Sequence, residues 1–165
     1  MVGQLPFPTC SRAWSELSER ERGVFCFDDE DLPLPRMHAA QIALLDADDA
    51  KRASEWLMSA LPSRWPEPDF TDEITLSLSD QWNSAEGIQS VRQWLHDRGI
   101  PYARQVYLIY DWERVVQMPW KLVVKYWDAV AYSVGVAMVT MDHTRQWACC
   151  FHHEAVIVFG TFKGT

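Results

Sequence analysis

The chain has 165 residues, of which 48% are hydrophobic and 23% are charged, a composition typical of a globular protein with a sizeable core. Its formal net charge of −8 disfavours nucleic acids and anionic membranes as partners, because both attract basic surfaces. The same charge would suit a basic protein partner. The length predicts one domain over residues 1–165, with no low-complexity linker to divide it.

The N-terminal part of the chain alternates between helical and extended patterns. A short helix is predicted over residues 11–23, followed by a strand over residues 24–27. The next predicted helix covers residues 46–61, with Asp46 as its cap and an apolar stripe along one side. Residues 62–70 are rich in proline and predict a loop.

The middle of the chain repeats this alternation. Residues 73–79 have the two-residue period of a half-buried strand. A helix is predicted over residues 83–99, because Asn83 resembles an N-cap and Gly99 stands where such a helix would end. Residues 104–112 then predict another strand.

The C-terminal third begins with a helix predicted over residues 119–132. Its apolar stripe includes Trp120 and Trp127, which we assign to the core. Extended segments follow at residues 135–142, 145–153 and 155–162. Alternating elements that end in a run of strands predict an α+β fold: a single domain in which helices cover one face of an antiparallel or mixed β-sheet.

Residues 149–154, with the sequence CCFHHE, concentrate the reactive side chains of the chain. On a strand, Cys150, His152 and Glu154 share a face, which raises the alternatives of a zinc site or a thiol nucleophile paired with His152 or His143. Ligands two apart on a strand lie roughly 6–7 Å from each other, too far to converge easily on one ion. We therefore expect a structural strand, with no metal, no cofactor and no catalytic residue.

Other signals of catalysis are weak. The sequence lacks the glycine-rich phosphate-binding, zinc-protease and serine-hydrolase motifs. Asp111 and Glu113 flank Trp112 after a predicted strand, a position typical of binding loops, but two nearby carboxylates are common in an acidic chain. We predict a protein that is not an enzyme.

The cellular compartment is predicted from the cysteines and the N-terminus. None of Cys10, Cys26, Cys149 and Cys150 forms a CxxC pair, and the first residues lack the pattern of a signal peptide. We expect a cytoplasmic protein with reduced thiols, either a monomer or a homodimer.

A resemblance covers roughly the last third of the chain. An Asp-Trp pair at Asp111 and Trp112, the KYWD sequence at residues 125–128 and the pattern W…HHE…FG at residues 147–160 resemble small bacterial immunity proteins of polymorphic toxin systems. The resemblance implies a protein-binding inhibitor that neutralises a cognate toxin inside the producing cell. Residues 1–100 and the apolar segment at residues 133–142 show no match to this pattern.

The leading hypothesis is therefore an immunity protein that blocks a basic toxin with an acidic surface. As partner-binding residues we predict the acidic run Asp28, Asp29, Glu30 and Asp31, with Trp65 or Trp112 as an aromatic anchor. Two alternatives stay open: a small hydrolase that uses Cys150 and His152, with or without zinc, and an interaction or scaffold domain without catalytic activity.

Overall fold

A computed structural model describes residues 4–23, 34–61, 70–132 and 137–162 of the chain. It confirms the predicted α+β class. The strands are β1 (Ser11–Ala13), β2 (Ala43–Leu45), β3 (Asp72–Ser77), β4 (Gln105–Ile109), β5 (Val115–Pro119), β6 (Met138–Met141), β7 (Trp147–His152) and β8 (Val156–Thr161). The helices are η1 (Trp14–Glu16, a 3-10 turn), α1 (Glu19–Gly23), α2 (Arg36–Ala39), α3 (Ala47–Met58), α4 (Ala85–His96) and α5 (Trp120–Tyr132).

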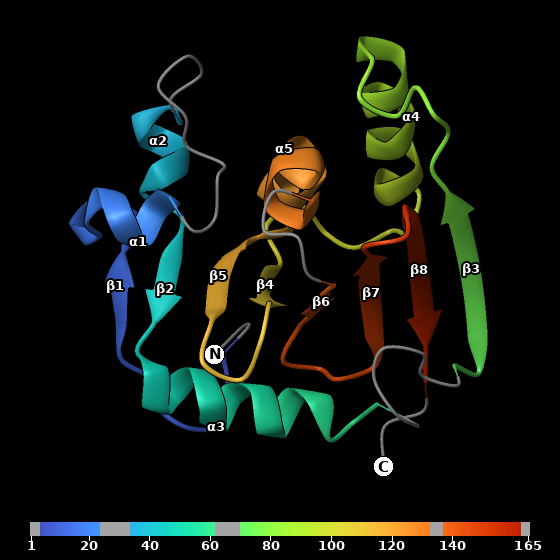
Figure 1. Cartoon of the computed structure of the whole chain (residues 1–165). Helices are drawn as coiled ribbons and strands as arrows, with labels where there is room; N and C mark the ends of the chain where they lie inside the picture. Colours follow the sequence, from blue (N-terminus) through green and yellow to red (C-terminus); the bar gives the residue numbers. More distant parts are fainter. Residues whose placement is uncertain (1–3, 24–33, 62–69, 133–136, 163–165) are drawn as a thin grey trace.

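All eight described strands form one sheet in the order β1-β2-β5-β4-β6-β7-β8-β3 (Figure 1). Every described pair of neighbours is antiparallel, which selects the first of the two predicted sheet types. The C-terminal strands β6, β7 and β8 are consecutive neighbours, as their short connections require. β3 lies at one edge of the sheet, and its Ile74 is 42% exposed rather than buried.

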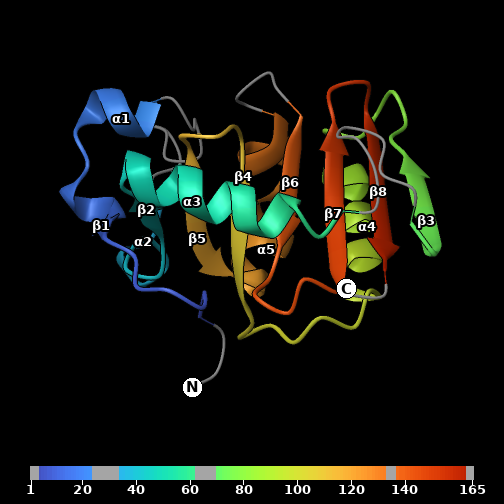
Figure 2. The same ribbon diagram turned by 90° about the horizontal axis from the view of Figure 1, so that it is seen from below.

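Helices cover both faces of the sheet. Figures 1 and 2 show α4 and α5 on one face and α3 crossing the strands on the other. Coverage of one face by helices agrees with the sequence prediction, whereas α3 on the opposite face is an arrangement that the sequence did not indicate. The central strands explain this arrangement. β4 and β6 are buried along nearly their whole length, so apolar side chains must pack against both faces of the sheet.

The core accordingly has two apolar clusters, one on each side of the sheet. The larger lies against α4 and α5 and contains the fully buried Trp120 and Trp127, as predicted from their helical stripe. The smaller lies against α3 and includes Leu57 and Val139. Trp127 also donates its indole N–H to the carbonyl of Ile88 at 3.2 Å, which ties α5 to α4.

The predicted helix over residues 11–23 is wrong in its first half. Residues Ser11–Ala13 instead form β1, because they pair with β2. The 3-10 turn η1 follows directly, and the α-helical part is limited to α1 at Glu19–Gly23. The true start of α1 is a reciprocal cap, in which the Glu21 amide donates to the Ser18 hydroxyl and the Ser18 amide donates to the Glu21 carboxylate. A tertiary strand pairing thus overrides a local helical pattern.

Two further details differ from the sequence prediction. The N-cap of α4 is Ser84 and not Asn83, since the Ser84 hydroxyl accepts the Gly87 amide at 3.1 Å. The sequence does not reveal β5, because a strand buried on both faces has no two-residue period. Gly99 does follow the end of α4 with φ of +72°, as expected of a glycine after a helix.

No helix among the described residues is long and apolar enough to cross a membrane. The strand predicted at residues 24–27 lies outside the described residues, as do Asp28, Asp29, Glu30, Asp31 and Trp65.

Candidate functional site

The turn between β4 and β5 is built around the side chain of Asp111. One carboxylate oxygen accepts hydrogen bonds from the backbone amides of Glu113 and Arg114, at 2.9 and 2.8 Å. The other oxygen accepts a hydrogen bond from Arg114 Nε at 2.6 Å. Tyr110 closes the turn by donating its amide to the Arg114 carbonyl at 3.1 Å. An Asp that caps its own turn in this way holds the backbone in one conformation. The residue at the tip, Trp112, is therefore presented from a rigid base.

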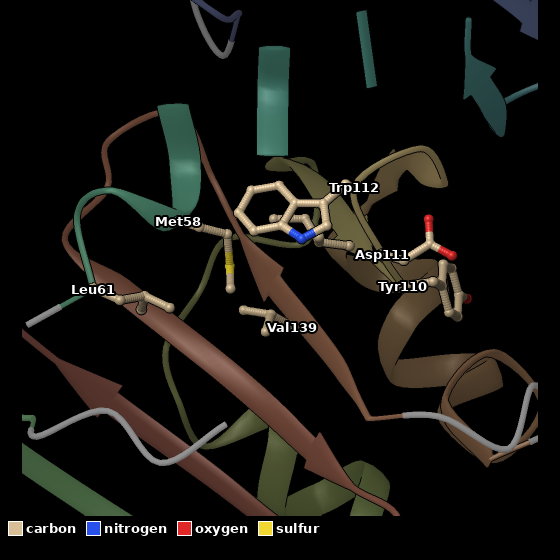
Figure 3. Close-up of a pocket in the computed structure, with 7 residues that line it drawn as sticks. Met58, Leu61, Tyr110, Asp111, Trp112 and Val139 are labelled. Carbon is tan, nitrogen blue, oxygen red and sulfur yellow. The ribbon is translucent and has the colours of Figure 1, made fainter. Parts of the chain in front are cut away.

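Trp112 is 56% exposed, the largest exposure of any described tryptophan. Its indole stands at the rim of an apolar pocket with a volume of about 270 Å³. The pocket is lined by Met58, Leu61, Ile109, Tyr110, Asp111, Trp112 and Val139. In Figure 3, Met58 lies between Trp112 and Leu61, and its side chain points toward Val139. We call this the Trp112 pocket.

Three separate elements meet to form the Trp112 pocket. Met58 is the last residue of α3, and Leu61 lies three residues further along the chain. Val139 belongs to β6. The other lining residues belong to the end of β4 and to the turn that follows it. The hydroxyl of the buried Ser54 lies 3.4 Å from the Asp111 carbonyl, so α3 contacts the turn directly. Because the pocket unites segments far apart in sequence, it is a product of the tertiary fold.

The electrostatics of the pocket are set by two ionisable side chains. Burial by itself raises the pKa of Asp111, but the hydrogen bonds from Glu113 and Arg114 outweigh it and leave that pKa below its ordinary value. Burial raises the pKa of Tyr110 well above its ordinary value, and its hydroxyl donates to the Val130 carbonyl at 2.7 Å. At neutral pH the rim therefore carries an ionised Asp111, and Tyr110 is neutral.

The fold does not assemble the zinc or thiol site that CCFHHE raised as an alternative. Both Cys149 and Cys150 are fully buried in β7, on opposite faces of the sheet. Burial raises the pKa of the Cys150 thiol to about 12, and that of Cys149 well above its ordinary value. A thiol nucleophile needs the reverse, namely a lowered pKa and access to substrate. Cys150 therefore serves as a small core side chain.

The remaining members of the motif lie at the surface end of β7. His152 is half-buried at the last position of the strand, whereas His153 and Glu154 are exposed in the β7–β8 turn. The extended segment predicted over residues 145–153 is therefore one residue too long at its C-terminal end, because β7 ends at His152. Within the part of the chain that the structure describes, no three His, Cys, Asp or Glu side chains are grouped to hold a metal ion.

Of the predicted partner-binding residues, Trp112 is the one that lies in the described part of the chain, and its side chain is exposed there. The sequence did not indicate Met58, Leu61 or Val139 as its neighbours. Their apolar side chains fit the ordinary periodic pattern of a core helix and strand, so no local signal separates them from core residues.

No protein-family model matches the chain, and neither a curated protein nor a solved structure was found to be similar to it.

Proposed function

We propose that this protein binds another protein through the Trp112 pocket, and that the partner is a basic toxin which it inhibits in the cytoplasm of the producing cell. The observation that carries the proposal is the exposed indole of Trp112, held on a rigid turn beside an apolar pocket. Tryptophan is among the residues that most often dominate binding energy at protein interfaces, especially next to a pocket that excludes water. A fixed turn lowers the entropy lost on binding.

The charge around Trp112 supports a basic partner. Glu113 is exposed beside the indole, and Asp111 is ionised at the rim. Arg114 offsets Asp111 locally at 2.6 Å, so the main attraction comes from the net charge of −8 on the whole chain. Such a charge accelerates association with a basic protein and makes the rate depend on salt. Asp28, Asp29, Glu30, Asp31 and Trp65 remain proposed contacts.

The identification of the partner as a toxin depends on the sequence resemblance to immunity proteins. Several residues of that resemblance have structural roles: Trp127 and Trp147 are buried, and Phe159 packs in the same cluster. Trp112 is the member of the pattern with a large exposed apolar side chain. In this proposal the shared core residues maintain the scaffold, and Trp112 contacts the toxin.

The test is affinity capture of the tagged full chain from a lysate of its source cell, at low and moderate salt. We expect one stoichiometric basic partner whose binding weakens as salt rises. Trp112→Ala should weaken capture by about 2 kcal/mol or more, the cost typical of a dominant interface residue. Tyr102→Ala is the matched control, because Tyr102 is another exposed aromatic, outside the Trp112 pocket.

Inhibition needs a separate measurement. The captured partner, expressed alone, should arrest growth, and co-expression of this protein should restore it. A partner that binds but has no toxic activity would identify an interaction or scaffold domain instead. Equal capture by the Trp112→Ala protein and the unaltered protein would show that the interface lies elsewhere.

A further inference from the structure

A second surface feature lies on the opposite side of the sheet from α3, between α4 and α5. It is a groove of about 420 Å³ in which basic side chains face one another across the two helices. Arg92 and His96 come from α4, Lys121 and Lys125 come from α5, and Tyr102 comes from the loop after α4. The spacings of three to four residues along each helix place these side chains on the facing sides. We call this the basic groove.

The basic groove has no acidic partner among the described residues. Its lining contains no Asp or Glu, and none of the described ion pairs involves Arg92, Lys121 or Lys125. Clustered like charges repel one another, and an anion bound among them relieves that repulsion. This arrangement is notable in a chain whose net charge is −8.

Arg92 is fixed in position by the backbone of the neighbouring helix. Its Nε and Nη2 donate to the Lys125 carbonyl at 3.1 and 2.7 Å. α5 departs from helical geometry at the next residue, Tyr126, with φ of −116° and ψ of 22°. The break in α5 therefore lies next to the Lys125 carbonyl, which accepts both hydrogen bonds from the Arg92 guanidinium. In consequence Arg92 holds its charge at the groove, and its Nη1 is not engaged by any described residue.

The positive field extends beyond the groove to α2. Burial lowers the pKa of His38, and the charges of Lys125 and Lys121 lower it further. The ring of His38 contacts Tyr126, with Nδ1 at 2.6 Å from the hydroxyl, so α2 packs directly against the kinked part of α5. The charges of the two lysines therefore reach a neighbouring element of the fold.

One wall of the basic groove is aromatic. Tyr102 is 47% exposed, and its hydroxyl lies 2.8 Å from His96 Nδ1. The two rings are 5.4 Å apart, centre to centre, which orients the tyrosine ring. Gln89 and Gln93 add amide groups that can both donate and accept hydrogen bonds. Cations, an oriented ring and amides together suit a ligand with an anionic part and a planar part.

We propose that the basic groove binds the phosphoryl group of a small ligand through Arg92, Lys121 and Lys125. An arginine supplies directional hydrogen bonds to phosphate oxygens, and lysines supply mobile point charges. The phosphoryl group can come from a nucleotide, whose base would stack on Tyr102, or from inorganic diphosphate. This inference is independent of the proposed function, because the groove shares no residue with the Trp112 pocket.

The experiment titrates the full-length protein with ADP and with inorganic diphosphate at low salt, by calorimetry and by NMR. We expect saturable binding with the largest NMR shifts at Gln93, His96 and Tyr102, and weaker binding as salt rises. The double variant Lys121→Gln/Lys125→Gln should bind about tenfold more weakly or worse. Both lysines are exposed, so their replacement leaves the core intact. Lys51→Gln, an exposed lysine of α3, is the matched control and should change nothing.

Tyr102→Ala separates the two sources of the phosphoryl group. Weaker binding of ADP with unchanged binding of diphosphate would identify a nucleotide site. Unchanged binding of both would identify a site for the phosphoryl group alone. The proposal is overturned if neither ligand saturates at about 10 mM, well above the ~1 mM dissociation constant of a weak site. It is equally overturned if Lys51→Gln weakens binding as much as the double variant does.

Discussion

Arg104, the residue before β4, lies 3.0 Å from the carboxylate of Asp142, which follows β6 and is almost completely buried. The other carboxylate oxygen of Asp142 accepts the Thr144 amide at 2.9 Å and also the Thr144 hydroxyl. One side chain therefore caps the β6–β7 turn and joins it to the segment that leads into β4. Because Arg104 directly precedes β4 and Asp142 directly follows β6, this pair links the ends of two strands that contribute to the Trp112 pocket.

Replacement of Asp142 should reveal how much this buried pair contributes. Asp142→Ala leaves Arg104 without its described partner and removes the turn cap, so we expect the free energy of unfolding to fall by about 3 kcal/mol. Urea denaturation measures the change. Asp80→Ala, at an exposed position, is the control and should stay within about 0.5 kcal/mol. If Asp142→Ala lowers the free energy of unfolding by no more than about 0.5 kcal/mol, as a surface substitution does, then water solvates Arg104 and Asp142 in the folded protein.

Two tryptophans of the chain should respond in opposite ways to truncation. Trp127 is fully buried and its ring lies 5.7 Å from that of Trp82, so Trp127→Ala should cost about 3–5 kcal/mol. Trp112 is exposed, so Trp112→Ala should change the free energy of unfolding by about 0.5 kcal/mol or less. Denaturant unfolding of both variants checks the contrast. A large loss for Trp112→Ala would show a structural role and weaken its assignment as a binding anchor.

The cap of α4 provides a direct comparison between adjacent residues. Ser84→Ala removes the hydroxyl that accepts the Gly87 amide, and it should destabilise the protein by about 1 kcal/mol. Asn83→Ala should have little effect, because Asn83 is exposed and is not the described cap. Thermal unfolding of the two variants gives the answer. A larger loss of stability for Asn83→Ala than for Ser84→Ala would instead support Asn83 as the cap, as the sequence predicts.

The buried thiols should be protected from alkylation in the folded protein. Cys10 is exposed and should react with iodoacetamide in the folded protein. Cys149 and Cys150 should react only after unfolding, since both are buried and protonated. Peptide mass spectrometry locates the modified residues. Rapid labelling of Cys150 in the native protein would restore the possibility of a thiol active site.

The same thiols predict a loss of stability in alkaline solution. Burial raises the pKa of Cys150 to about 12, whereas a thiol in the unfolded chain has a pKa of about 8.5. The unfolded state therefore loses its proton first, so the stability is complete below about pH 8.5 and declines as pH rises toward the folded pKa. The free energy of unfolding should fall by about 2 kcal/mol between about pH 8 and about pH 10 from this residue.

Cys150→Ala isolates that contribution, since other groups also titrate in this range. The variant should lose less stability over the same pH interval than the unaltered protein. Identical pH profiles for the two proteins would show that Cys150 keeps an ordinary pKa and is hydrated.

Much of the secondary structure could be predicted from local sequence. The stripe that ends in Ala131 identified α5, and the extended pattern around Cys149 identified β7, because each element has the period of its own geometry. β1 and β5 could not be predicted in this way. β1 exists through its pairing with β2, and β5 is buried on both faces, so neither carries a local period.

The candidate sites divide in the same manner. The sequence by itself determined the acidic charge, predicted the α+β class and singled out Trp112 as a candidate aromatic anchor. Only the tertiary structure decided which residues surround Trp112, that Cys150 is buried, and that Arg92 faces Lys121 across two helices. The physical reason is that periodicity reports which face of an element is apolar, whereas a site depends on which faces meet. That choice is made by the packing of the whole chain.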